Sequence, residues 1–195
     1  MVLILAAGDA SRMGSVKQLL PFNNTTLIQT VIKNALGTKA NKVFCVLGAN
    51  IEVIKNEVKT DSVTFISNTN WKEGLSSSIV AGISFFQTSK IEIDAILIML
   101  ADQPKVDSNY LNELIKFHEN NKDKIVASTY GHKKGVPAIF PSSSFNELLR
   151  LKGDKGAQLF LNNPTQNVIT PILKSSDILK DIDTPQDYEQ FLKNS

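Results

Sequence analysis

The chain has 195 residues, of which 42% are hydrophobic, and its 21 Lys and Arg against 19 Asp and Glu leave a net charge of +2. This length suits one domain with a sizeable core, so we expect a single domain over residues 1–195, and the small charge gives no reason to expect nucleic acid as a partner. The single Cys excludes a disulfide scaffold and a CxxC zinc site and indicates the reducing cytoplasm, while apolar runs no longer than a strand exclude a membrane span.

The first half of the chain alternates apolar runs with segments of helical periodicity. Val2–Leu5 predicts a buried parallel strand that ends at Ala6, Ala7 and Gly8. Thr25 or Thr26 is a candidate N-cap for a helix that ends before Gly37. Further strands are predicted at Val43–Leu47 and Val63–Ile66, and further helices at Ile51–Val58 and Leu75–Phe86.

The second half continues the alternation. Ala95–Ala101 predicts the most apolar strand, which is broken by Asp102-Gln103-Pro104. The remaining predictions are a helix from Ser108 to about Asn120, strands at Ile125–Tyr130 and Ala138–Phe140, helices from Ser142 to Leu151 and on to Leu161, a strand at Val168–Ile172 and a helix from Pro185. Alternating strands and helices predict a three-layer α/β domain with a mostly parallel central sheet, whose ligands bind beyond the carboxyl ends of the strands.

The loop after the first strand is suited to bind a nucleotide. Small residues at Ala6, Ala7 and Gly8 let a base or phosphate approach the backbone, and Arg12 and Lys17 supply two cations for a triphosphate. The segment matches neither GxxxxGK[ST] nor GxGxxG, so neither a Walker loop nor a dinucleotide fingerprint is indicated. The alternative is an ordinary turn with solvated basic residues.

Two carboxylates are candidate metal ligands. Asp102 follows the most buried predicted strand, and Mg²⁺ takes oxygen ligands, usually one or two carboxylates together with substrate phosphates. Asp183 lies before Pro185, where either a second ligand or a helix N-cap at Asp183 or Thr184 is expected.

A third segment, Asn68–Ser78, places Gly74 and the hydroxyl of Ser78 at a predicted helix start. Helix N-termini favour anions and hydroxyls suit a ribose or a base edge, although plain caps are common there. The basic turn Gly131–Pro137 could face an anionic acceptor or be a solvated hairpin tip.

These motifs together resemble the MobA-like NTP transferases, and within them the molybdenum cofactor cytidylyltransferase branch. The matching segments, in the family's order over the whole chain, are Leu5-Ala6-Ala7-Gly8 with Arg12-Met13-Gly14, Lys17 with Leu19-Leu20-Pro21, Asn70-Trp71 with Gly74 and Ser78, Ala101-Asp102-Gln103-Pro104, Gly153-Asp154-Lys155-Gly156-Ala157, and Asp181-Ile182-Asp183-Thr184-Pro185 with Asp187-Tyr188. The opening loop specifies only the superfamily, whereas the combination is more specific, and the Ala-Ala-Gly opening is similar to the branch that uses CTP.

The resemblance implies a Rossmann-like, GT-A-type nucleotidyltransferase fold and Mg²⁺-dependent transfer of CMP from CTP to the terminal phosphate of the molybdopterin cofactor. It implies the following site: Arg12, Lys17 and Asp102 catalytic; Leu5, Ala6, Ala7, Gly8, Arg12, Lys17, Gly74, Ser78 and Asp102 at the nucleotide; and Asp102 and Asp183 at the metal. A molybdoenzyme of the xanthine dehydrogenase type is the implied recipient of the product.

One departure concerns the acceptor. Family members often have Gly-His-Pro or Gly-Asn-Pro there, whereas this chain has Gly135-Val136-Pro137 and so lacks a polar group. The alternatives are a cytidylyl- or uridylyltransferase for another small phosphate ester and a carrier of the molybdenum cofactor without catalytic activity. The set Arg12, Lys17, Asp102 and Asp183 argues against a carrier, which has no need to neutralise a triphosphate, and the missing fingerprint argues against a nicotinamide-dependent oxidoreductase.

Overall fold

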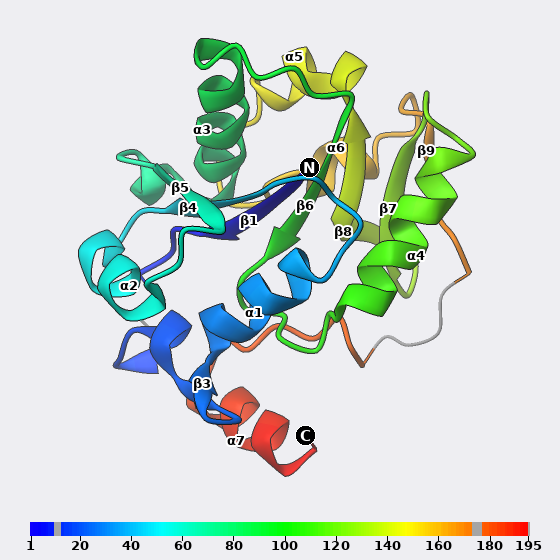
Figure 1. Cartoon of the computed structure of the whole chain (residues 1–195). Helices are drawn as coiled ribbons and strands as arrows, with labels where there is room; N and C mark the ends of the chain where they lie inside the picture. The colour runs from blue at the N-terminus through cyan, green and yellow to red at the C-terminus, as the bar shows by residue number, and fades with distance from the viewer. Residues whose placement is uncertain (10–12, 173–176, 195) are drawn as a thin grey trace.

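Short runs of aliphatic residues form the centre of the molecule. The computed structural model describes residues 1–9, 13–172 and 177–194 and contains a seven-stranded sheet in the order β5-β4-β1-β6-β8-β7-β9 (Figure 1). The strands are β1 (Val2–Ala6), β4 (Val43–Leu47), β5 (Val63–Ser67), β6 (Ala95–Leu100), β7 (Ile125–Tyr130), β8 (Lys133–Pro141) and β9 (Val168–Ile169). β1 pairs in parallel with β4 and β6, β4 with β5, and β7 with β9, whereas β8 runs antiparallel to β6 and β7. The predicted mostly parallel sheet is therefore confirmed.

Helices cover both faces of the sheet. One face carries α1 (Leu27–Leu36), α2 (Ile51–Val58) and α4 (Ser108–Glu119), and the other carries α3 (Leu75–Thr88), α5 (Phe145–Leu148) and α6 (Gln158–Leu161). Alternate side chains of β1 enter the two cores: Ile4 packs in the first and Leu5 in the second. Each core lies between the sheet and one set of helices, so the domain has the three predicted layers of helices, sheet and helices. In the described parts of the chain no helix has the length and apolar character that a membrane crossing requires.

The last helix, which the sequence predicts from Pro185, packs with a small hairpin that the sequence pattern does not predict. β2 (Pro21–Phe22) pairs with β3 (Thr25–Thr26) across Asn23-Asn24, and both Asn residues have positive φ, as a tight hairpin turn requires. α7 (Pro185–Lys193) lies against this hairpin, where Tyr188 donates a hydrogen bond to the Pro21 carbonyl (2.5 Å). The hairpin therefore joins the loop after β1 to the C-terminal segment.

Other boundaries also differ from the expectation. β8 begins at Lys133 rather than Ala138 because Lys133 pairs with Tyr130, so most of the basic segment is strand rather than turn. The predicted helix from Ser142 to Leu151 is limited to a 3-10 turn and the four residues of α5. Thr26, rather than Thr25, caps α1, because its hydroxyl accepts the backbone N–H of Gln29 while the Gln29 side chain accepts that of Thr26.

Cys45 in β4 is fully buried, and this burial raises the pKa of its thiol far above the usual range. We expect the Cys45 thiol not to react with Ellman's reagent in the folded protein. After denaturation in guanidinium chloride it should react and release one equivalent of the thionitrobenzoate chromophore per chain. Reaction of the native protein within minutes would contradict the burial of this strand.

Candidate functional site

A pocket of about 700 Å³ opens at the carboxyl ends of β1 and β6. Its walls are formed by the loop after β1, the loop after β6, the start of α3 and the segment that leads into α7. Of the predicted site residues, those lining the pocket are Leu5, Ala6, Ala7, Gly8, Lys17, Gly74, Ser78, Asp102 and Asp183. The remaining one, Arg12, lies outside the described residues. The topology therefore brings together predicted residues that are as much as 178 positions apart, since Leu5 and Asp183 line one pocket.

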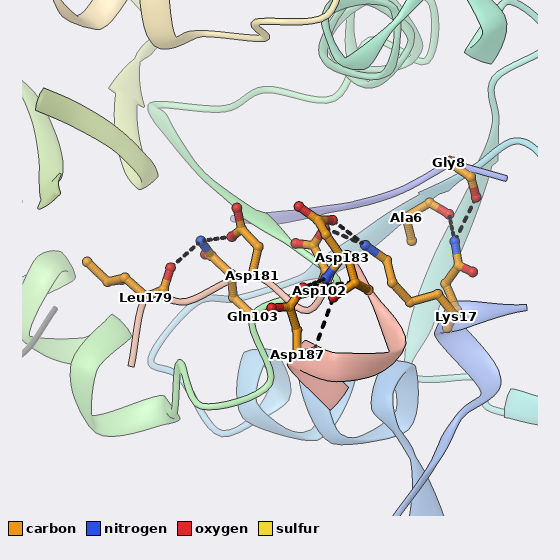
Figure 2. Close-up of polar contacts among 11 residues, drawn as sticks. Ala6, Gly8, Lys17, Asp102, Gln103, Leu179, Asp181, Asp183 and Asp187 are labelled. Carbon is orange, nitrogen blue, oxygen red and sulfur yellow. Dashed lines mark hydrogen bonds and ion pairs between the residues drawn. The ribbon is translucent and has the colours of Figure 1, made fainter. Parts of the chain in front are cut away.

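A lysine and two aspartates form the charged floor of this pocket. The ammonium nitrogen of Lys17 lies 2.9 Å from Oδ2 of Asp102 and 3.0 Å from Oδ1 of Asp183 (Figure 2). Burial alone would lower the pKa of Lys17, but the charges and hydrogen bonds of Asp102 and Asp183 outweigh it, so the pKa is raised. Lys17 therefore remains cationic at neutral pH, where it can meet an anionic ligand.

The two aspartates also have the chemistry of a divalent-cation site. Oδ1 of Asp102 is buried and finds no hydrogen-bond partner among the described residues, while the Asp183 side chain is half exposed. Within residues 1–9, 13–172 and 177–194, no group of three or more His, Cys, Asp or Glu could hold a metal ion alone. Two carboxylates that leave further positions to water and phosphate fit Mg²⁺, which is commonly bound in this way.

Asp183 is available because the neighbouring residue caps α7. The hydroxyl of Thr184 accepts a hydrogen bond from the backbone N–H of Asp187. The Asp187 carboxylate in turn accepts hydrogen bonds from the backbone N–H groups of Thr184 (2.8 Å) and Asp183 (3.1 Å; Figure 2). Of the two interpretations of this segment, the cap is thus Thr184, and the Asp183 carboxylate faces Lys17.

The Gln18 side chain, which the sequence interpretation did not single out, fixes the loop after β1. Its Nε2 donates to the carbonyls of Ala6 (3.1 Å) and Gly8 (2.9 Å), and the side chain is buried beside the pocket. On the other side of the loop, the Ala7 carbonyl accepts the N–H of Ala49 (3.0 Å). Three successive carbonyls are thus held by protein donors.

Gln103, which follows Asp102, has a similar role on the opposite side of the floor. Its Nε2 lies 2.7 Å from Oδ1 of Asp181, 3.1 Å from the Leu179 carbonyl and 2.8 Å from the Tyr130 hydroxyl (Figure 2 shows the first two contacts). Tyr130 in turn donates to the Val136 carbonyl. Burial, followed by the nearby charge of Asp102, raises the pKa of Asp181 to about 6. Gln103 therefore joins the β6 loop to the C-terminal segment and to the β7–β8 hairpin.

The start of α3 packs closely against the 152–156 loop. Gly74 has φ +96° and ψ −179°, a conformation that is essentially limited to glycine, and a Cβ there would lie 2.2 Å from Oδ1 of Asp154. Asp154 and Trp71 line the pocket beside it. The buried Ser78 hydroxyl accepts a hydrogen bond from Asn68 Nδ2 (3.1 Å), so this hydroxyl is already hydrogen-bonded within the protein.

Residues 2–168 match the model of the MobA-like NTP transferase domain. A nicotine blue oxidoreductase of Paenarthrobacter nicotinovorans is 25% identical, with 97% of this chain and 95% of that protein aligned. The purine catabolism protein PucB of Bacillus subtilis is 27% identical (96% and 93% aligned), and the molybdenum cofactor cytidylyltransferase of Escherichia coli is 24% identical (95% and 92% aligned).

Solved structures with the same fold cover almost the whole chain. Rv0371c of Mycobacterium tuberculosis H37Rv superimposes with a TM-score of 0.82 at 26% identity, covering 98% of this chain and 96% of that one. A complex of Rv0371c with manganese gives a TM-score of 0.77 at 24% identity, covering 100% and 98%. The three-layer domain thus has the Rossmann-like, GT-A-type nucleotidyltransferase fold.

Proposed function

The chain belongs to the MobA-like NTP transferase family, and we propose that it transfers CMP from CTP to the terminal phosphate of the molybdopterin cofactor. The observation that carries the proposal is the Lys17 ammonium between the carboxylates of Asp102 and Asp183 on the floor of the pocket. The choice of CTP rests on the Ala-Ala-Gly opening and on the similarity to the E. coli cytidylyltransferase.

In the proposed reaction an oxygen of the acceptor phosphate attacks the α-phosphorus of CTP, and the bond to the leaving pyrophosphate breaks. The acceptor is already anionic, so the chain needs no strong general base and acts mainly by positioning and charge neutralisation. Lys17, with Arg12, neutralises charge on the departing pyrophosphate, and the Ala6–Gly8 backbone receives the base. Asp102 and Asp183 would hold the divalent cation, which when bound withdraws electron density from the phosphates.

The segment expected to face the acceptor, Gly135-Val136-Pro137, carries no polar side chain. Val136 stands where relatives of the cytidylyltransferase branch often carry His or Asn, and its carbonyl is held by Tyr130. A cytidylyl- or uridylyltransferase for another phosphate ester therefore remains the second candidate, separated by competition between acceptors in a pyrophosphate-release assay. Delivery of the product to a xanthine dehydrogenase-type enzyme, like cytoplasmic residence, stays a prediction.

Calorimetric titration with CTP, GTP, ATP and UTP, each with Mg²⁺, tests the nucleotide. We expect CTP to bind at least about tenfold more tightly than the others, because a pocket that pairs with a base edge rejects bases that leave its polar groups unpaired. The same titration in EDTA should weaken CTP binding, since Asp102 and Asp183 would then face the triphosphate without a cation. Failure of all four nucleotides to bind would contradict the transferase function and favour the cofactor carrier.

A further inference from the structure

Gln18 has no charge to contribute to the reaction, yet its side chain is only 4% exposed and lies beside the pocket, directly after Lys17. The two residues form a 3-10 turn with Leu19, so that Lys17 reaches the carboxylates on the floor while Gln18 reaches back to the end of β1. The turn thus places the Lys17 cation in the pocket and the Gln18 amide against the loop that forms the pocket wall. We call the Gln18 amide with its hydrogen bonds to the Ala6 and Gly8 carbonyls the clamp.

The clamp holds the loop at the point where the sheet no longer does. β1 ends at Ala6, and Gly8 lies beyond its ladder with β4. The two hydrogens of the Gln18 amide bridge the carbonyls on either side of Ala7, while Ala49 holds Ala7 itself from the neighbouring loop. Without the amide, the Ala6 and Gly8 carbonyls lose a partner that fixes the backbone at this position.

The clamp also has a cost, which points to a role other than packing. Oε1 of Gln18 is buried and has no hydrogen-bond partner in the described parts of the chain, and a buried unpaired acceptor destabilises the folded state. An apolar side chain of similar volume would avoid this cost if filling space were the only requirement. The amide is therefore explained by the two carbonyls that it holds.

Gly8 indicates what the clamped loop faces. Among the residues that the structure describes, a Cβ placed on Gly8 would meet no atom within 4 Å, and Gly8 does not have positive φ, so neither packing against them nor backbone conformation requires glycine there. Open space over a pocket-lining glycine lets a flat ligand approach the backbone.

We propose that Gln18 is a positioning residue for the nucleoside half of the substrate: it holds the Ala6–Gly8 backbone in the conformation that receives the base, while Lys17 on the same turn receives the phosphates. This inference rests on the proposed function. It assigns base affinity and phosphate affinity to adjacent residues, so the two can be separated experimentally.

The test compares Gln18→Met with the wild type for two probes, CTP and inorganic tripolyphosphate, each titrated with Mg²⁺. We expect Gln18→Met to weaken CTP binding at least about tenfold, because a misplaced backbone loses its contacts with the base, and to change tripolyphosphate binding less than about threefold. Gln18→Leu, which also removes the amide and adds no charge beside Lys17, should likewise weaken CTP selectively and serves if the Met variant does not fold.

Asn162→Leu is the matched control. In the wild type the Asn162 amide also bridges two backbone carbonyls, those of Lys134 (2.8 Å) and Gln158 (2.7 Å), but Asn162 lies outside the pocket. Loss of this amide should therefore leave the affinities for CTP and for tripolyphosphate unchanged. Unchanged CTP affinity in Gln18→Met, or an equal loss for both probes, would overturn the positioning role alone. Absence of CTP binding to the wild type would instead overturn the proposed function, and this inference with it.

Discussion

The Asp102→Asn protein is expected to lose Mg²⁺-dependent nucleotidyl transfer by at least about a thousandfold while remaining folded, because the substitution keeps the shape of the side chain and removes the charge that we propose holds the cation at the reacting phosphates. Oδ2 of Asp102 contacts Lys17 at 2.9 Å, and the buried Oδ1 has no hydrogen-bond partner within residues 1–9, 13–172 and 177–194. Asn can still accept a hydrogen bond from Lys17 but binds a divalent cation much more weakly. Pyrophosphate release from CTP with molybdopterin cofactor measures the loss, and thermal unfolding checks the fold.

Asp177→Asn provides the control for this variant. Asp177 also pairs with a lysine, Lys180, at 3.0 Å, but both side chains are largely exposed and Asp177 lies outside the pocket. Its loss should leave turnover unchanged, since exposed ion pairs contribute little. An Asp102→Asn enzyme that retained Mg²⁺-dependent activity would refute the metal assignment.

Gly74→Ala is expected to lower the free energy of unfolding by at least about 3 kcal/mol, because a strained backbone conformation and an overpacked contact add. The new methyl group would lie 2.2 Å from Oδ1 of Asp154 and 2.7 Å from the backbone carbon of Gly153, so the 152–156 loop must move away from the start of α3. Since Asp154 lines the pocket, CTP affinity should fall as well. Urea unfolding and calorimetry measure the two effects.

Gly131→Ala separates backbone strain from the clash. Gly131 also has positive φ (+63°), but a Cβ there would meet no atom of the described residues within 4 Å, and the residue lies at the β7–β8 turn. We expect a loss of about 1 kcal/mol, the cost of a left-handed residue other than glycine, with CTP binding unchanged. If Gly74→Ala and Gly131→Ala lowered the free energy of unfolding equally, the clash with the 152–156 loop would make no contribution at Gly74, and this prediction would be wrong.

The sequence predicts the parts of the fold that depend on local pattern. The apolar runs of β1, β4 and β6 identify buried strands without any knowledge of their neighbours. The segments after β1 and β6 and the segment before Pro185 contain the candidates Lys17, Asp102 and Asp183, which the family resemblance joins into one site. The two-residue strands β2 and β3 contain too few residues for a periodicity to be detected, and the helix predicted up to Leu151 is longer than the four residues of α5.

The missed residues of the site are those whose partners come from remote segments. Gln18 and Gln103 follow charged residues, but nothing local indicates that one bridges Ala6 and Gly8 and the other reaches Asp181. For Thr184 a local signal did exist, because an acidic residue three positions after a threonine is typical of a capping box. That signal would have distinguished the cap from Asp183.

The two ion pairs of Lys17 join residues that are 85 and 166 positions apart in the chain. Contacts of such long range must overcome the entropy of closing large loops and form only after the intervening elements are in place. During folding, the sheet and its helices can therefore gain most of their stability while the charges of the pocket are still separate. The ability to bind a nucleotide is consequently one of the last properties that the folding chain acquires.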